Sequence, residues 1–595
     1  VLHSTVGLSF WGGVSPKNGL IVDRHHPLCG VSLEGKILAI PAGRGSCTGS
    51  QVILELLLNG ASPAAIVLCQ PDEIIALGAI VAEELFDRKL PVLCLEEDAF
   101  HSLSTWRTAS INGSMLWRSG NESVDTREEE EEQIELSTTD QQMLSGSEGL
   151  ARQKALSIVT RMARLQRATS LVDVTQAHID GCTYIGPASL QFAQKLLEWG
   201  ATVRVPTTLN AISVDLARLH EVSEELGRPA ASLAEAYLKM GAKASFTCAP
   251  YLLETAPKKG EQVGWGESNA VVFANSVLGA RTQKYADFLD ACVAITGRAP
   301  LAGCHVDRSA GVVLHVKMDL SKVDDAFYPT LGYLCGLKAP RLIPAVVGLE
   351  SLSPTRDDLK AFSAAFGTSS SAAMFHLVGL TPEAPDLQSV LDDDVQVINL
   401  EKEDFLEVWK DLDADSPCDV DLVSLGNPHF SLEEHQRMAE LCRGRQKHPD
   451  VQVVVTSGPQ VLEKSRRLGF GTELEAFGAQ LVSDTCWCML GEVVPAPSSI
   501  LPPQSRTLIT NSAKYAHYAP GLVNRRVRFG SLASCIDAAC DRVVRNQPPW
   551  LPGGAHMVGV WPCSLQGLQA RGSSTLATGH KALSRMAVRM LRHMG

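Results

Sequence analysis

One segment of this chain decides its fold, residues 245–281, which have the sequence SFTCAPYLLETAPKKGEQVGWGESNAVVFANSVLGAR. The segment combines one thiol, two carboxylates, two amides and one guanidinium, and small residues separate them: Cys248, Glu261, Glu267, Asn269, Asn275 and Arg281. Small residues let the backbone approach a ligand closely and leave the polar side chains little freedom to turn away. The segment therefore predicts a ligand-binding site rather than ordinary core.

Composition and charge restrict the class of protein. The chain has 595 residues, 45% of them hydrophobic and 20% charged, which is typical of a soluble protein with more than one domain. A net charge of −13 argues against a nucleic-acid partner. No apolar run is long enough to span a bilayer, so we expect no membrane partner and a cytoplasmic location. The 16 cysteines are scattered, which indicates free thiols in a reducing compartment rather than a disulfide framework.

The N-terminal part predicts a small α/β domain over residues 1–104. Short apolar runs bounded by glycine and proline predict strands at residues 36–40, 64–68 and 90–93. A helical pattern from Gln51 to Asn59 is followed by Gly60, which is typical of a helix C-terminus.

A second, larger α/β domain is predicted over residues 136–543. Residues 105–135, with five consecutive glutamates at 128–132, predict an acidic linker. A helix-start cluster follows at Ser137–Asp140, and strand-like runs (201–205, 451–455) then alternate with helix-like ones (188–198, 432–442). The change in composition over residues 544–595 predicts a disordered tail.

A glycine-rich loop lies between the predicted strand 36–40 and the helix that follows it. Its sequence over residues 41–50 is PAGRGSCTGS, without the lysine of a nucleotide-binding P-loop. Such a loop presents free N–H groups and a partial positive charge to an anion. The alternative is a tight turn with an N-cap serine.

Several polar side chains outside the loop are candidates with structural alternatives. Thr207 and Asn210 follow the predicted strand 201–205, where α/β sheets bind ligands, although both could be helix caps. Arg281 could hold a carboxylate bidentately, and Glu267 could orient a ligand, act as an acid or pair with Arg281. His376, in an apolar run, is either a core residue or a proton donor.

Three segments of the larger domain resemble the large-subunit signature of the aconitase X family: Thr247–Tyr251, Trp265–Arg281 and Thr381–Ala384. The segments at residues 10–14, 23–28 and 43–50 resemble the small subunit of that family. The resemblance covers residues 5–104 and 136–543. It implies a small swivel-type β/α domain fused to a larger multi-layer α/β aconitase-like domain, with the active site in the cleft between them.

The resemblance also implies a hydro-lyase that dehydrates a small β-hydroxy acid. Single-chain members resemble enzymes that convert cis-3-hydroxy-L-proline to Δ1-pyrroline-2-carboxylate, whereas two-chain members act on mevalonate 5-phosphate. A non-catalytic cluster- or ligand-binding descendant is the third alternative. Since both subunit-like parts lie in one chain, we expect a monomer.

The family pattern gives the site residues their expected functions. Ser46 is the catalytic base, with Thr48 and Ser50 as alternative hydroxyls, and Glu267 is the second catalytic residue. The residues expected to bind the substrate lie in both domains: Arg44, Gly45, Thr48, Thr207, Asn210, Ser268, Asn269, Asn275, Arg281, His376 and Lys514.

Three cysteines in family-like loops are the expected ligands of an iron–sulfur cluster: Cys248, Cys486 and Cys535. Cys488 is a weaker candidate. The segment Leu425–His429 departs from the family pattern because Asn427 stands where the family has cysteine. An amide cannot supply a thiolate, which favours a smaller cluster such as 2Fe–2S or another ligand. His429 is a ligand, a substrate contact or a loop cap.

Overall fold

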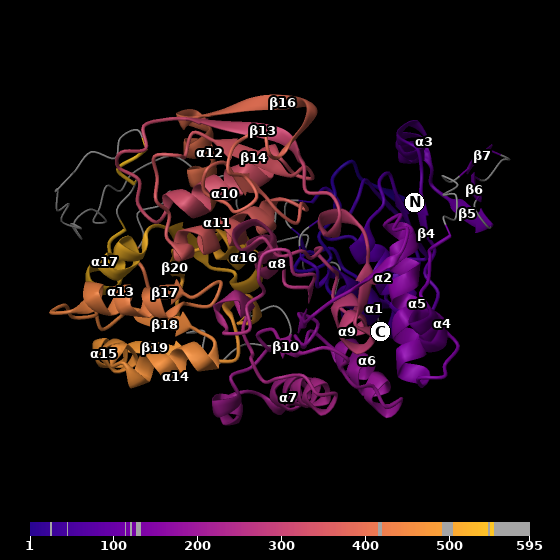
Figure 1. Ribbon diagram of the computed structural model, residues 1–595, viewed down its shortest axis with the longest axis horizontal. Helices are drawn as coiled ribbons and strands as arrows, with labels where there is room; N and C mark the ends of the chain where they lie inside the picture. Colours follow the sequence, from indigo (N-terminus) through magenta and orange to yellow (C-terminus); the bar gives the residue numbers. More distant parts are fainter. Residues whose placement is uncertain are drawn as a thin grey trace, which may run out of the picture. The chain divides into compact units, whose positions relative to one another are not determined.

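The computed structural model describes residues 1–23, 26–44, 46–112, 115–118, 122–125, 133–413, 419–490, 504–544 and 548–551 (Figure 1). They belong to one compact unit, Val1–Gly554; the second unit, Ala555–Gly595, lies outside the described residues. The acidic run 128–132 and most of the predicted tail also lie outside them. Among the described helices, none combines the length and apolar character needed to cross a membrane.

The N-terminal domain is built on a four-stranded parallel sheet in the order β1-β2-β3-β4. Its strands are β1 (Leu2–His3), β2 (Ile37–Ile40), β3 (Ala65–Leu68) and β4 (Val92–Cys94). Helices α1 (Gly49–Leu58), α2 (Glu73–Phe86) and α3 (Glu97–Ser102) connect or follow them. The predicted strands and helix are confirmed, and Gly60 has the positive φ, 70°, that a helix C-terminus requires.

The predicted linker contains a small antiparallel sheet. Strands β5 (Ala109–Asn112), β6 (Met115–Arg118) and β7 (Glu122–Asp125) pair in sequence order. Buried Trp106 and Leu116 pack into a cluster with Leu95 and Phe100 of the N-terminal domain. These apolar anchors explain why the described part of residues 105–125 is structured, unlike the flexible linker that the composition predicts.

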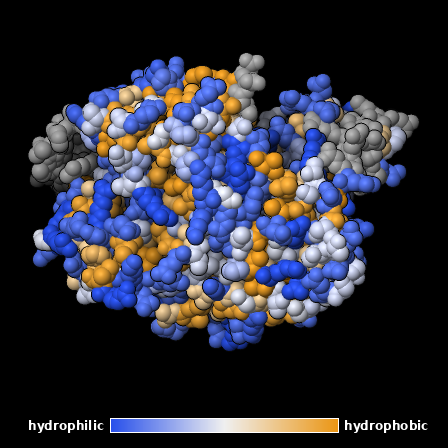
Figure 2. Space-filling model, viewed as in Figure 1, coloured by the Kyte–Doolittle hydropathy of each residue, from blue (hydrophilic) through white to orange (hydrophobic). Residues whose placement is uncertain are grey.

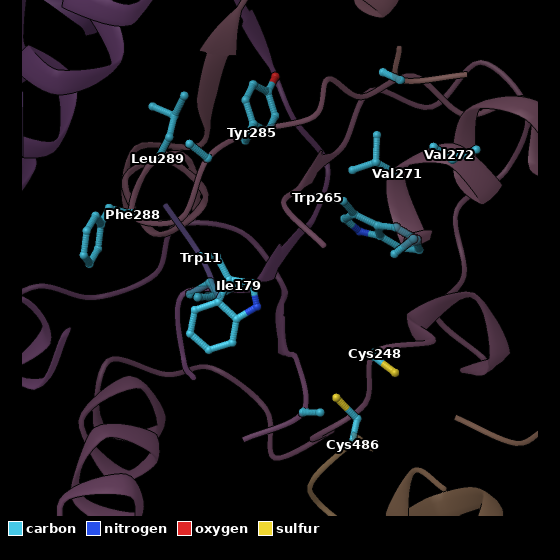
Figure 3. Close-up of a cluster of buried hydrophobic side chains, with 14 of the residues drawn as sticks. Trp11, Ile179, Cys248, Trp265, Val271, Val272, Tyr285, Phe288, Leu289 and Cys486 are labelled. Atoms are coloured by element: carbon cyan, nitrogen blue, oxygen red, sulfur yellow. The ribbon is translucent and has the colours of Figure 1, made fainter. Parts of the chain in front are cut away.

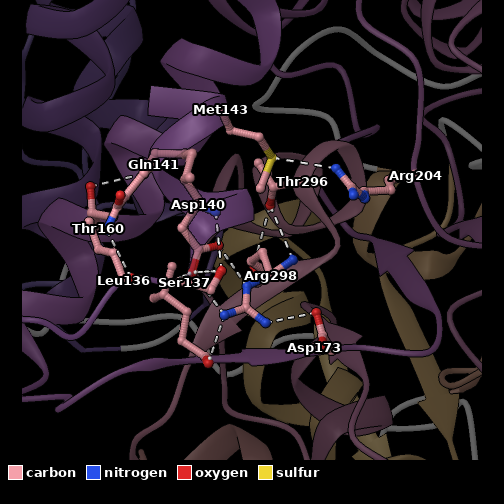
Figure 4. Close-up of polar contacts among 12 residues, drawn as sticks. Leu136, Ser137, Asp140, Gln141, Met143, Thr160, Asp173, Arg204, Thr296 and Arg298 are labelled. Atoms are coloured by element: carbon pink, nitrogen blue, oxygen red, sulfur yellow. Dashed lines mark hydrogen bonds and ion pairs between the residues drawn. The ribbon is translucent and has the colours of Figure 1, made fainter. Parts of the chain in front are cut away.

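The next domain begins where the helix-start cluster predicts. Ser137 and Asp140 form a capping box at α4 (Thr138–Leu144), and α5 (Leu150–Leu165) follows. Arg298 ties this start to the sheet behind it, since its guanidinium binds Asp140 (2.9 Å) and Asp173 (2.7 Å), as Figure 4 shows.

Two small sheets form the centre of this domain. Strands β8 (Leu171–Asp173) and β12 (Arg298–Pro300) are antiparallel, whereas β10 (Thr207–Leu209), β9 (Ala177–Ile179) and β11 (Gly264–Trp265) are parallel in that order. The strand predicted at 201–205 is wrong: the ladder begins at Thr207, after Pro206, which has no N–H to donate. The helical elements are α6 (Pro187–Glu198), η2 (Leu216–Glu221), α7 (Glu224–Lys239), η3 (Pro250–Leu252), α8 (Ser268–Phe273), η4 (Ala274–Leu278), α9 (Leu289–Thr296) and η5 (Gly303–His305).

A third layer carries a parallel sheet in the order β15-β14-β13-β16. Its strands are β13 (Ala310–Lys317), β14 (Pro344–Val347), β15 (His376–Leu377) and β16 (Leu391–Glu401). Figure 1 shows α10 (Phe327–Lys338), α11 (Arg356–Ser369) and α12 (Lys402–Leu412) on one side of β13, β14 and β16.

The last sheet is parallel, in the order β19-β18-β17-β20-β21. Its strands are β17 (Leu422–Leu425), β18 (Gln452–Thr456), β19 (Ala479–Val482), β20 (Thr507–Thr510) and β21 (Arg526–Phe529). Its helices are α13 (Leu432–Cys442), α14 (Pro459–Arg467), α15 (Phe470–Phe477), η6 (Trp487–Met489), α16 (Ala513–Val523) and α17 (Leu532–Asp541). The predicted helices 188–198 and 432–442 and the strand 451–455 are confirmed as α6, α13 and β18.

The described part of the predicted tail is ordered. Trp550 is buried against Phe327, Phe405 and Trp409, and its indole N–H donates to Asp324 (2.8 Å). Figure 2 shows hydrophilic side chains over much of the visible face, with hydrophobic ones in smaller groups between them. The α/β fold class predicted from the sequence is confirmed.

Candidate active site

Three polar side chains meet where β9, β10 and β11 end. The strands are parallel and in register, so their carboxyl ends lie at one edge. Asp180, Asn210 and Glu267 follow directly or one residue later. Asn210 Nδ2 donates to the Asp180 carboxyl and to Glu267 Oε2 (3.2 Å). Asn210 and Glu267, both candidates from the sequence, therefore lie together at the carboxyl ends of parallel strands.

A second set of side chains comes from the last sheet. In that sheet the chain runs from β17 through β18 to β19 on one side and from β20 to β21 on the other. The gap between β17 and β20 is therefore a topological switch point, where such sheets bind ligands. Asn427 and His429 follow β17, and Lys514 follows β20. Lys514 Nζ lies 2.8 Å from Glu267 Oε1, which joins the two sets into one site.

Glu267 is held as a carboxylate. It is the N-cap of α8 and accepts hydrogen bonds from the N–H (3.3 Å) and Nδ2 (2.6 Å) of Asn269. Burial favours the neutral acid, but Lys514 and the Asn269 hydrogen bonds outweigh it and bring the pKa of Glu267 to about 2. The Lys514 pKa is correspondingly raised, against the effect of burial. The partner of Glu267 is thus Lys514 rather than Arg281, whose guanidinium donates to the His305 carbonyl (3.0 Å).

Three thiols lie beside this ion pair. Cys248 precedes η3, and Cys486 and Cys488 lie at η6; the Cys486 thiol interacts with those of Cys248 and Cys488. Figure 3 shows Cys248 and Cys486 next to one another at the edge of the buried cluster that contains Trp265. Contact with the Cys248 thiol raises the pKa of Cys486, and contact with the Cys486 thiol raises the pKa of Cys488.

The thiols receive N–H groups from the β17 loop. The His429 N–H donates to Cys248 Sγ (3.3 Å), and Asn427 Nδ2 donates to Cys488 Sγ (3.1 Å). Asn427 therefore contacts the thiol group even though it cannot itself supply a thiolate. His429 is fixed between Thr247 and the Thr485 carbonyl, and burial lowers its pKa to about 4, so it is neutral.

Cys535, the third predicted ligand, lies elsewhere. It is in α17, fully buried in the apolar cluster between that helix and the last sheet, whereas Cys248 and Cys486 belong to a different cluster. Among the described residues, no three Cys, His, Asp or Glu side chains already surround one common metal position. The Cys486 thiol instead interacts with both Cys248 and Cys488, and three thiols are a donor set whose chemistry suits an iron–sulfur group.

The glycine-rich loop of the N-terminal domain docks against the start of α9. Ser50 Oγ donates to the Asp287 carbonyl (2.9 Å), and Gln51 Nε2 donates to Asp287 Oδ2 (2.6 Å). Ser46 Oγ donates to Thr48 Oγ1 (3.1 Å), and Thr48 is the N-cap of α1. Arg44 pairs with Asp23 (2.5 Å), and Gly45 lies outside the described residues.

The other predicted substrate contacts have partners within the protein. Thr207 Oγ1 donates to the Val205 carbonyl (2.8 Å), and Asn275 is fully used by Thr282 and Ala373 backbone groups. His376 is buried in β15, where its ring bonds the Arg308 carbonyl (2.7 Å). Asn269 binds Tyr251 and the Cys248 carbonyl as well as Glu267, so it supports the site, and neighbouring Ser268 is half-buried at the start of α8.

Three aspartates were missed by the sequence analysis: Asp180, Asp287 and Asp290. The signal for Asp180 was its place directly after β9, but no polar cluster marks it. Asp290 accepts four backbone N–H groups, those of Asp180, Gly181, Phe288 and Ala291. Burial together with neighbouring carboxylates raises the pKa of Asp180 well above its usual value and that of Asp287 to about 7.

Comparisons with known proteins agree with this architecture. Four aconitase X profiles match the chain: the swivel domain at residues 1–117, the first domain at 133–308, the second at 310–410 and the third at 420–541. The chain is 54% identical to the cis-3-hydroxy-L-proline dehydratase of Pseudomonas aeruginosa, covering 93% of this chain and 96% of that protein. It is 49% identical to the enzyme of the same name from Hypocrea jecorina, covering 92% and 94%.

The fold matches a solved structure as well. The crystal structure of Thermococcus kodakaraensis aconitase X in its holo form is 30% identical, with a TM-score of 0.61, and the match covers 68% of this chain and all of that one.

A small swivel domain whose glycine–serine loop meets the polar strand ends of larger α/β domains defines a hydro-lyase of the aconitase type. More narrowly, the chain belongs to the aconitase X family, in the form that carries the swivel and the three larger domains in one chain.

Proposed function

We propose that this protein dehydrates cis-3-hydroxy-L-proline to Δ1-pyrroline-2-carboxylate. The observation that carries the proposal is the 54% identity to a dehydratase of that substrate, which extends over the swivel domain and all three larger domains. The polar site supports it, since it combines an ionised carboxylate, an ammonium group and a serine hydroxyl.

The charges of the site fit the groups of the substrate. A hydroxyproline has a ring ammonium, a carboxylate and a hydroxyl on neighbouring atoms. Glu267, which is ionised at neutral pH, binds the ring ammonium, and Lys514 binds the carboxylate. This assignment makes Glu267 an orienting carboxylate rather than an acid, because a pKa of about 2 leaves it without a proton to give.

Ser46 removes the proton next to the substrate carboxylate. A serine has a high intrinsic pKa, so its alkoxide must be stabilised by nearby groups. The N-terminus of α1 lies directly after the loop, and its free N–H groups and dipole favour negative charge there.

Cys248, Cys486 and Cys488 hold an iron–sulfur cluster in this proposal. When bound, such a group supplies an open iron that acts as a Lewis acid on the departing hydroxyl. Cys488 replaces Cys535 of the sequence prediction because it contacts Cys486, and Asn427 and His429 donate N–H groups to the sulfurs. Cluster size, a monomeric state and a cytoplasmic location stay predictions.

The direct test is an assay of anaerobically purified, iron- and sulfide-reconstituted full-length protein. We expect formation of Δ1-pyrroline-2-carboxylate from cis-3-hydroxy-L-proline, followed by trapping with o-aminobenzaldehyde. The trans-3 isomer controls for stereochemistry, and mevalonate 5-phosphate tests the second family substrate. Turnover of mevalonate 5-phosphate without turnover of the hydroxyproline would overturn the assignment.

A further inference from the structure

We propose that Thr48 and Asp287 form a proton relay behind Ser46, in which the Thr48 hydroxyl passes the Ser46 proton to the Asp287 carboxylate. The proposal deepens the proposed function and rests on Ser46 acting as its base. Thr48 and Asp287 are positioning residues in this scheme, since they act through Ser46.

The first half of the relay is the short Ser46–Thr48 link. Ser46 Oγ donates to Thr48 Oγ1 (3.1 Å), and the Thr48 N–H returns a hydrogen bond to Ser46 Oγ (3.3 Å). Thr48 is buried, whereas Ser46 is half-buried. This orientation suits a relay, because the Ser46 hydroxyl proton points toward Thr48 Oγ1. The Ser46 oxygen meanwhile faces the Thr48 N–H, which can stabilise a negative charge on it.

The second half joins the swivel domain to the first domain. The Thr48 hydroxyl interacts with the Asp287 carboxylate and lowers the Asp287 pKa. Gln51 Nε2 fixes Asp287 Oδ2 (2.6 Å), and the Asp287 backbone is held by Ser50 Oγ and by the Cys47 carbonyl. Asp287 Oδ1 is buried and, among the residues that the structure describes, has no well-formed hydrogen bond, so it can take a proton.

Asp180 completes the acceptor. Its carboxyl contacts that of Asp287, and two carboxyls can share a hydrogen bond only if one of them carries a proton. Asn210 Nδ2 donates to Asp180 Oδ1, which leaves the other oxygen to carry that proton toward Asp287. In the resting enzyme Asp180 is therefore the acid and Asp287 the carboxylate.

The charges around the pair support this division. Burial raises the pKa values of both acids, and Asp290 and Glu267 raise the Asp180 pKa further; the Asp287 pKa of about 7 lets Asp287 exchange a proton near neutrality. The buried thiols Cys47 and Cys182 and the Tyr237 phenol also interact with the pair, and burial raises the pKa of each.

The steps balance without an added reactant. As the substrate Cα–H proton moves to Ser46 Oγ, the Ser46 proton moves to Thr48 Oγ1 and the Thr48 proton moves to Asp287. The Cα–H electron pair forms the new double bond, and the C–O pair leaves with hydroxide. Return of the Asp287 proton through Thr48 and Ser46 converts the hydroxide to water and restores the resting state.

The kinetic test compares Thr48→Val with Thr48→Ser. Valine keeps the shape and removes the hydroxyl, so we expect kcat to fall roughly a hundredfold with KM little changed, whereas serine should restore most of kcat. Asp287→Asn should cost a similar factor. Because both act in one relay, Thr48→Val/Asp287→Asn should lose about as much as either single variant. The relay would be overturned if the kcat losses of the two single variants multiplied in the double variant, or if Thr48→Val turned over at the normal rate.

A control separates the relay from support of the loop. Asp72 is a half-buried aspartate that holds this loop, since its Oδ2 accepts from the Gly43 N–H (2.9 Å), and none of its hydrogen bonds goes to Thr48 or Asp287. Asp72→Asn should lower the melting temperature. When it is combined with Thr48→Val, its effect on kcat should multiply with that of Thr48→Val, unlike the effect of Asp287→Asn.

A spectroscopic test needs no substrate, and so distinguishes failure of the relay from failure of the proposed function. Infrared spectra of the resting enzyme at neutral pH should contain the band of a buried protonated carboxyl that shifts in deuterated water and is lost in Asp180→Asn. If wild-type enzyme does not dehydrate cis-3-hydroxy-L-proline but this band is present, the function is wrong and the carboxyl pair stands. An unchanged band in folded Asp180→Asn overturns the relay whatever the substrate. If Asp180→Asn does not fold, the kinetic comparison of Thr48→Val with Thr48→Ser decides.

Discussion

Two groups of buried carboxylates at the same sheet edge differ in charge. Glu267, paired with Lys514, has a pKa of about 2, whereas Asp287, beside Asp180, has a pKa of about 7. Both are buried, so burial alone does not separate them. The difference is the neighbour: an ammonium group beside Glu267 and further carboxyls beside Asp287. One region is built to bind charge, and the other to hold and move a proton.

The largest expected effect comes from removing one of the three thiols beside Glu267. Cys486→Ala should abolish the visible absorption of reconstituted protein and all dehydratase activity, because the Cys486 thiol interacts with both Cys248 and Cys488. Cys535→Ala is the decisive comparison: the structure predicts that iron content and colour are retained. Bleaching by Cys535→Ala with retention by Cys486→Ala would reverse the assignment of ligands.

The next effect concerns the ion pair. Lys514→Met should leave a buried, unpaired Glu267 and cost about 3 kcal/mol in unfolding free energy. Lys514→Met/Glu267→Gln should recover part of that stability, since the uncompensated charge is gone, but not the activity. Urea unfolding of the apoprotein measures both. Equal stability of Lys514→Met and wild type would show that water compensates Glu267.

The pH dependence of stability should have opposite signs in the two regions. The folded-state pKa of Glu267 lies below its ordinary value of 4.5, so its stabilisation is complete above pH 4.5 and is lost as the pH falls toward 2. That of Asp287 lies above 3.8, so its ionisation costs stability progressively as the pH rises from about 4 to 7.

Melting temperatures of Glu267→Gln and Asp287→Asn across pH 3 to 8 measure this contrast. Relative to wild type, Asp287→Asn should become more stable as the pH rises, and Glu267→Gln less stable. Parallel curves for the two variants would refute the contrast.

The sequence predicted part of this arrangement for physical reasons. Asn210 was a candidate because it follows a predicted strand, although the strand lies at Thr207–Leu209 rather than 201–205, and Glu267 was a candidate because it lies in the polar segment 245–281. Asp287 was missed because its partner Gln51 lies 236 residues away, a contact that no local pattern reveals. The sequence favoured Cys535 over Cys488 as a ligand, because only packing shows that α17 buries Cys535 away from the other thiols.

The smallest expected effect compares two threonines that the sequence treats alike. Thr207 and Thr48 are both buried and both were predicted to bind substrate, but the Thr207 hydroxyl donates to the Val205 carbonyl, whereas Thr48 accepts from Ser46. Thr207→Val removes one local hydrogen bond at a position where a β-branched residue suits the strand, so we expect a loss of about 1 kcal/mol in stability. Its kcat should stay within about twofold of wild type, against roughly a hundredfold loss for Thr48→Val. Steady-state kinetics of the two variants, measured at matched cluster content, make the comparison. A large kcat loss in Thr207→Val would mean that its hydroxyl turns from Val205 to the substrate, and that the strand end, as well as the swivel loop, takes part in the reaction.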